Sequence, residues 1–98
     1  MKRKLDLQLI QRASKVLRCI GHPDRLRIVE CLESGTLPVG SMTKALGLSQ
    51  VRLSKHLSVL KKHGIVSSAA RANYRDYSIA YPGIIPLLNC MRQHGGKS

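Results

Sequence analysis

The chain has 98 residues, which is enough for one domain and not for two. Its 17 Lys and Arg residues against 5 Asp and Glu residues give a formal net charge of +12, which favours a polyanionic partner over a merely soluble basic protein. Because no apolar run approaches the ~20 residues of a membrane-spanning helix, and no secretion signal begins the chain, we expect a cytoplasmic protein without a membrane partner.

The first part of the sequence predicts two helices. Apolar residues recur at helical spacing over residues 6–20, which indicates a first helix. Pro23 fits the first position of a second helix, where its missing N–H is not needed, and Asp24 suits the positive start of that helix. We expect this helix to end near Gly35 and a short strand to follow at 37–39.

A helix-turn-helix comes next. Residues 41–46 predict a short third helix closed by Gly47, and a fourth helix begins at Ser49, a good N-cap. Gly64 can take the left-handed conformation that ends this helix. Its apolar side consists of leucines at helical spacing, Leu53, Leu57 and Leu60. A helix held on one side, with polar groups near its N-terminus, fits a recognition helix in a DNA groove.

The last third of the chain predicts a β-hairpin and a final helix. We expect strands at 65–69 and 75–79, joined by a tip at 70–74. A helix over 84–94 follows, with residues 95–98 frayed. The order α-α-α-α-β-β-α predicts a mainly α protein with a small β-hairpin, which is the order of a winged helix-turn-helix.

The sequence resembles the ArsR/SmtB family of bacterial and archaeal repressors. The stretches that carry the resemblance are HPDRLRI at 22–28, LGLSQ at 46–50, LSKHL at 53–57, VLK at 59–61 and GIV at 64–66, with Tyr77 as a wing-strand tyrosine. The resemblance covers nearly the whole chain. It implies a single DNA-binding domain over 1–98 that dimerises through its first and last helices and represses transcription.

Two departures from the family pattern remove its common metal sites. Many members carry a C-x-C thiolate pair in the third helix, but the corresponding stretch, 37–42, contains no cysteine. Others bind zinc through Asp and His on the last helix, where this chain offers only Cys90 and His94. We therefore expect neither a metal nor another cofactor. The wing tip, usually Glu-Gly, is Arg71-Ala72 here, which exchanges a negative charge for a positive one.

Residues at the start of the fourth helix and in the hairpin are the candidates for DNA contact. Gln can read adenine, Arg or Lys can read guanine, and a helix N-terminus can hold a phosphate. The helix candidates are Ser49, Gln50, Arg52, Ser54 and Lys55, and the wing candidates are Arg71, Asn73 and Arg75. A solvated helix face is the alternative for the first set. We expect His22 to cap the second helix and His56 to be structural.

The three cysteines, Cys19, Cys31 and Cys90, have no paired spacing, which argues against a disulfide scaffold. If the first and last helices pack together, Cys19 and Cys90 can approach each other within or across subunits. A thiol modification there would change the dimer geometry, which makes the pair a candidate sensor. Two buried apolar cysteines are the plainer alternative.

The function we expect is sequence-specific repression by a homodimer bound to a pseudo-palindromic operator in double-stranded DNA, released by a small inducer or a thiol modification. Catalysis has little support, because the sequence has no paired-carboxylate motif, phosphate loop or nucleophile elbow. Two alternatives remain. One is a non-specific or architectural nucleic-acid binder of the same fold, and the other is a module that binds a protein partner.

Overall fold

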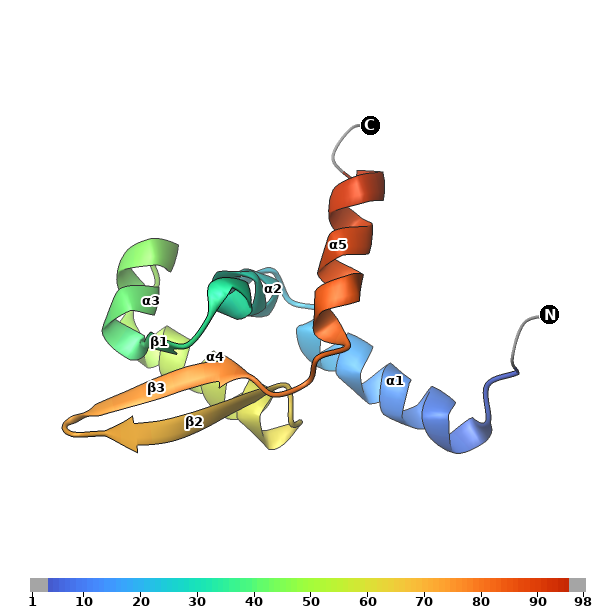
Figure 1. Ribbon diagram of the computed structural model, residues 1–98, viewed down its shortest axis with the longest axis horizontal. Helices are drawn as coiled ribbons and strands as arrows, with labels where there is room; N and C mark the ends of the chain where they lie inside the picture. The colour runs from blue at the N-terminus through green and yellow to red at the C-terminus, as the bar shows by residue number, and fades with distance from the viewer. Residues whose placement is uncertain (1–3, 96–98) are drawn as a thin grey trace.

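The computed structural model describes residues 4–95, which form five α-helices and one three-stranded antiparallel sheet (Figure 1). The elements are α1 Leu7–Ile20, α2 Pro23–Cys31, β1 Leu37–Pro38, α3 Val39–Leu46, α4 Gln50–Lys62, β2 Val66–Arg71, β3 Tyr74–Ile79 and α5 Ile84–Gly95. The predicted fold class and order of elements are confirmed. Among these residues, no helix is long and apolar enough to cross a membrane.

Helix α1 is anchored at its C-terminal end and uncovered along most of its apolar side. Asp6 caps the helix, since its Oδ1 accepts a hydrogen bond from the backbone N–H of Leu9 at 2.7 Å. Only Cys19 and Ile20 are buried, whereas Leu17 is 54% exposed. Helices α1 and α5 extend from the end of the molecule opposite the hairpin tip (Figure 1).

Helix α2 begins as predicted and ends earlier. The Nδ1 atom of His22 accepts a hydrogen bond from the backbone N–H of Asp24 at 3.1 Å, which confirms the predicted cap. Regular α-helix stops at Cys31, and a 3-10 turn over Leu32–Ser34 completes the stretch predicted as one helix. The backbone N–H of Gly35 closes this turn on the carbonyl of Leu32.

The helix-turn-helix consists of α3, a three-residue turn and α4. Helix α3 begins at Val39, two residues before its predicted start, because the short strand ends at Pro38 and the chain turns directly into the helix. Gly47 takes a φ of 68° in the turn, a conformation that favours glycine. Ser49 then caps α4, accepting a hydrogen bond from the backbone N–H of Arg52 at 3.2 Å.

The strands pair in the order β1-β3-β2, so that the long hairpin forms the wing. Pairing of β2 with β3 continues to Arg71 opposite Tyr74. The hairpin tip is therefore only Ala72 and Asn73, and the predicted tip over 70–74 is too long. Both strands extend past their predicted ends at the loop because backbone hydrogen bonding persists to the two-residue loop, whereas β2 begins at Val66, one residue after its predicted start.

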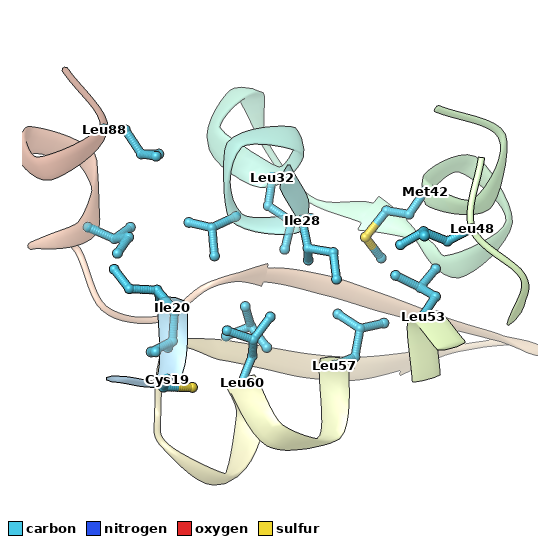
Figure 2. Packing of buried hydrophobic residues seen from close by; sticks show 14 residues of the cluster. Cys19, Ile20, Ile28, Leu32, Met42, Leu48, Leu53, Leu57, Leu60 and Leu88 are labelled. Carbon is cyan, nitrogen blue, oxygen red and sulfur yellow. The ribbon is translucent and has the colours of Figure 1, made fainter. Parts of the chain in front are cut away.

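The core joins the helix-turn-helix to the sheet and to the start of α5. Figure 2 shows the leucines of α4, Leu53, Leu57 and Leu60, facing the side of the cluster that holds α2. These three side chains are at most 1% exposed, which confirms the predicted apolar side of α4. Ile84 and Leu88 bring α5 against the same cluster. Helix α5 continues one residue past its predicted end to Gly95, which was predicted to be frayed, and residues 96–98 of that predicted end lie outside the described range.

Candidate nucleic-acid interface

The side of α4 opposite the buried leucines is solvent-exposed along the helix. Its residues recur at spacings of three and four, which places them in one stripe. The stripe consists of Val51, Ser54, Lys55 and Ser58, all exposed. Lys61, near the end of α4, donates a hydrogen bond to Ser68 of β2 at 2.9 Å, so the helix and the wing are linked. The surface therefore combines a helix face with an adjoining hairpin.

The N-terminal end of α4 carries most of the predicted helix contacts. Ser49 and Gln50 are exposed at the start of the helix. The backbone N–H groups of the first turn have no carbonyl acceptor within the helix. Ser54 and Lys55 lie one turn further along the exposed side. The fold thus brings four of the predicted residues together at one end of one helix.

Arg52 has a different setting from its neighbours. Its guanidinium contacts the Asp24 carboxylate at 2.7 Å, an ion pair between α4 and the first turn of α2. The Arg52 side chain is 63% exposed and the Asp24 side chain 12%. Arg27 adds a weaker contact with Asp24 at 3.8 Å and donates to the carbonyl of Leu46 at the end of α3. Sequence reasoning identified Arg52 but missed its partner, which lies 28 residues away.

Two histidines complete this junction between α2 and α4. The rings of His22 and His56 lie 4.6 Å apart, and the Nε2 atom of His56 lies 3.6 Å from Asp24. Arg25 donates from Nε to Nδ1 of His56 at 3.3 Å. Burial lowers the pKa of His56, and the neighbouring His22 and Arg25 lower it further, which favours the neutral ring. His56 therefore acts as a structural residue, as predicted.

The His22, Asp24 and His56 side chains place three potential metal ligands within 4.8 Å of one another. Their hydrogen bonds oppose that use. Each ring accepts a hydrogen bond at Nδ1, so the lone pair of that nitrogen is already engaged and unavailable to a metal. The Arg52 guanidinium already holds the carboxylate. The cluster fits a hydrogen-bonded helix junction better than a cation site.

The wing presents all three predicted contact residues to solvent, in two different electrostatic settings. Arg71 pairs with Asp76 across the hairpin at 2.7 Å and lies over the Tyr74 ring, 5.3 Å from its centroid. Part of the positive charge gained by having Arg71 at the wing tip is therefore balanced within the wing. Arg75 donates to Ser68 at 3.0 Å, a neutral partner that leaves its charge available. Asn73 is exposed in the loop.

The predicted thiol pair lies in two separate places. Cys19 is 4% exposed and lines a hollow beside Lys15, Arg18, Arg25 and His63, whereas Cys90 is exposed and lines a hollow between α2 and α5. The alternative of two buried cysteines therefore holds only for Cys19. Burial and then the charge of Glu30 raise the pKa of Cys31, which is a poor setting for a reactive thiol.

Comparisons with known proteins are consistent with this geometry. The model of the family described as "Bacterial regulatory protein, arsR family" matches residues 22–68, which run from the cap of α2 through α4 into β2. The uncharacterised helix-turn-helix transcriptional regulator Rv0081 of Mycobacterium tuberculosis is 35% identical over 81 residues, covering 82% of this chain and 71% of that protein.

Two further relatives extend the match. The biofilm growth-associated repressor of Xylella fastidiosa is 31% identical over 78 residues, covering 80% of this chain and 68% of that repressor. Among solved structures, HlyU of Vibrio cholerae superposes with a TM-score of 0.83 at 25% identity, over 92% of this chain and 98% of HlyU. Sequence and fold therefore point to the same group of proteins.

Proposed function

This chain belongs to the ArsR family of bacterial regulatory proteins, and we propose that it is a homodimeric repressor of a pseudo-palindromic operator in double-stranded DNA. Its relatives are named as transcriptional regulators and repressors, not as enzymes, and the proposal is regulation without catalysis. In the proposed complex, α4 of each subunit enters a major groove, and the wing contacts the neighbouring backbone or minor groove.

The observation that carries the proposal is the exposed side of α4. That helix is fixed through its buried leucines, while Ser54 and Lys55 stand free on the opposite side. Lys55 suits guanine O6 and N7, and Gln50 suits adenine. Ser49 and the first-turn amides suit a phosphate, and Arg71, Asn73 and Arg75 suit backbone or minor-groove contacts. Arg52 contributes through its exposed guanidinium, which can contact DNA while held by Asp24.

The proposed dimer rests on the uncovered apolar sides of α1 and α5. Large apolar side chains stand exposed on these two helices: Leu7, Leu9, Ile10, Leu17 and Met91. Large apolar side chains left exposed together on two helices are typical of an interface. A second copy of the chain would bury it and place two α4 helices on one face of DNA.

Selection from a pool of random-sequence duplexes tests the proposal. A homodimer should enrich a sequence with two inverted half-sites about 10 base pairs apart, centre to centre. Lys55→Ala should erode the preference within each half-site. Arg75→Ala should weaken binding to all duplexes alike, since a phosphate contact carries no base information. An enriched sequence without inverted symmetry would contradict the homodimer.

A second candidate function is non-specific or architectural nucleic-acid binding. It is favoured by basic residues far from α4, namely Arg12, Lys15 and Arg18 on α1, none of which forms an ion pair within residues 4–95. This candidate predicts tight binding at low salt and no enriched sequence. Binding that does not change with salt would contradict both candidates, because phosphate contacts release counterions.

For release from DNA, we propose modification of Cys19 or Cys90. Cys90 is accessible on α5, and Cys19 is buried at the end of α1, so both lie on helices of the proposed dimer interface. The test is to titrate the operator complex with a sulfide donor, an oxidant and arsenite, using Cys19→Ser and Cys90→Ser variants. If both variants respond as the wild type does, these thiols are not the sensor.

A further inference from the structure

Val51 is an exposed apolar residue in the first turn of α4. It is 66% exposed, although most large apolar side chains of the helix-turn-helix are buried. A β-branched residue in a helix loses side-chain freedom, and at this exposure it gains little burial within the chain. Its neighbours on the exposed side, Ser54 and Lys55, are polar. Nothing within the described part of the chain uses this side chain.

The direction of Val51 follows from helix geometry. At about 100° per residue, Val51 stands almost diametrically opposite the stripe of Leu53, Leu57 and Leu60. Arg52 is turned toward α2, as its ion pair with Asp24 shows, and Gln50 lies closer to the buried side. Of the first-turn residues, Val51 therefore projects most directly away from the protein. A helix that inserts its N-terminal end into a groove would place this side chain toward the groove floor.

The chemistry available at that floor decides what Val51 can recognise. The major groove displays hydrogen-bond donors and acceptors, and one apolar group, the 5-methyl of thymine. A valine side chain cannot hydrogen bond, so its recognition partner must be apolar. Resting on the DNA-binding function proposed above, we propose that Val51 is a specificity-determining residue that contacts the 5-methyl group of a pyrimidine in each half-site. Thymine and 5-methylcytosine both carry this group.

The experiment uses the duplex selected from the random pool and removes one methyl group at a time. Each thymine is replaced by deoxyuridine, and binding of the full-length protein is followed by fluorescence anisotropy. At one symmetric position per half-site, loss of the methyl should weaken wild-type binding by about fourfold, equivalent to the roughly 0.8 kcal/mol of one buried methyl-sized group. The other thymines are internal controls.

Variants assign this penalty to Val51. Val51→Ala, which retains good helix propensity, should bind the thymine and deoxyuridine duplexes equally well at that position. Val51→Thr, which keeps one methyl, should retain part of the penalty. With a C·G pair at that position, 5-methylcytosine should bind the wild type more tightly than cytosine, and the Val51→Ala variant should lose this gain. Comparing the cytosine duplex with the 5-methylcytosine duplex thus distinguishes recognition of the methyl group from recognition of the thymine base as a whole.

The possible outcomes distinguish a failure of the Val51 contact from a failure of the proposed repressor function. If an operator is selected but no thymine shows a penalty that depends on Val51, the inference is wrong and the proposed repressor stands. If no sequence is enriched, the proposed function fails and the inference fails with it. If Val51→Ala alters sedimentation of the free protein instead of the methyl profile, Val51 belongs to a protein contact, which also contradicts the inference.

Discussion

Asp24 faces Arg27, Arg52 and His56 at the junction of α2 and α4. Its carboxylate lies in the first turn of α2, where the helix dipole favours negative charge, and it receives the Arg52 guanidinium from α4. It is the one charged residue that is buried among those described. The angle between α2 and the recognition helix therefore depends on a few charge-assisted contacts as well as on leucine packing.

Replacing Asp24 by Asn tests that dependence. Asp24→Asn keeps the shape of the side chain and removes its charge, so we expect the free energy of unfolding to fall by about 1–3 kcal/mol, measured by urea denaturation. Asp76→Asn is the matched control, because among the described residues Asp76 pairs with Arg71 alone whereas Asp24 also faces Arg27 and His56, and we expect a loss below about 1 kcal/mol. Equal losses in the two variants would show that the α2–α4 junction holds no special contact.

His56 makes stability depend on pH at the same junction. Because the fold lowers the pKa of His56 below its ordinary 6.5, the unfolded chain binds a proton more readily than the folded chain. The contribution of the neutral ring is complete above pH 6.5 and is lost as pH falls below that value. The groups facing the ring are His22, Arg25, Asp24 and Arg52.

His56→Gln removes the titrating ring while keeping a polar side chain. The wild type should lose stability in urea between about pH 7 and pH 5, and the variant should show a shallower slope over the same window. Identical slopes would mean that the ring is equally easy to protonate in the folded and unfolded chains.

Sequence reasoning at the residue scale succeeded for local contacts and missed distant ones. The caps at Ser49 and His22 were predictable because a cap and its amide are two or three residues apart. The Asp24–Arg52 pair was not, since 28 residues separate the partners and only the packed fold brings them together. A helical wheel alone would have placed Val51 on the exposed side of α4. It was not identified as a candidate because only polar and charged residues were considered for DNA contact.

At the scale of elements, the wing hairpin turns more tightly than its sequence favours. Ala72 takes a φ of 55°, the one positive φ of a non-glycine residue within 4–95. A positive φ at the first loop position is the pattern of a type II′ turn, where glycine is preferred. The strand lengths could not be predicted because the sequence lacks that glycine signal.

Ala72→Gly should therefore relieve strain in the wing. Relief of the strain should raise the free energy of unfolding by about 1 kcal/mol. The greater conformational entropy of glycine in the unfolded chain offsets part of this gain. Asn73→Gly is the control, because Asn73 does not have a positive φ, and it should give no gain. Thermal melting of the three proteins measures both effects, and a gain for Asn73→Gly alone would contradict the turn geometry.

On the scale of the whole molecule, every acidic residue forms a hydrogen bond or an ion pair within the chain. Many of the basic residues in the described part of the chain have no acidic partner. Asp6 caps α1, Asp24 and Asp76 pair with arginines, and Arg92 contacts both Glu30 and Glu33. These are the 5 acidic residues of the sequence, against 17 Lys and Arg residues. The composition predicted a polyanionic partner, and each carboxylate within residues 4–95 already has a partner inside the chain.

The dimer proposed above has its own test on α1. Leu17 is exposed in the single chain, so Leu17→Glu should leave the fold intact and prevent association. Sedimentation should shift from dimer to monomer, and operator affinity should fall by about a hundredfold or more through loss of the second half-site. Gln11→Glu adds the same charge on the polar side of α1 and should remain dimeric. A dimeric Leu17→Glu variant would place the interface elsewhere.

The ratio of two dissociation constants tests most directly whether this protein is a sequence-specific repressor. The duplex selected from the random pool and a scrambled duplex of the same length are titrated with the full chain at physiological salt. The proposed function predicts that the selected duplex binds at least about a thousandfold more tightly, and that Lys55→Ala reduces this ratio. Equal dissociation constants for the two duplexes would contradict sequence-specific repression.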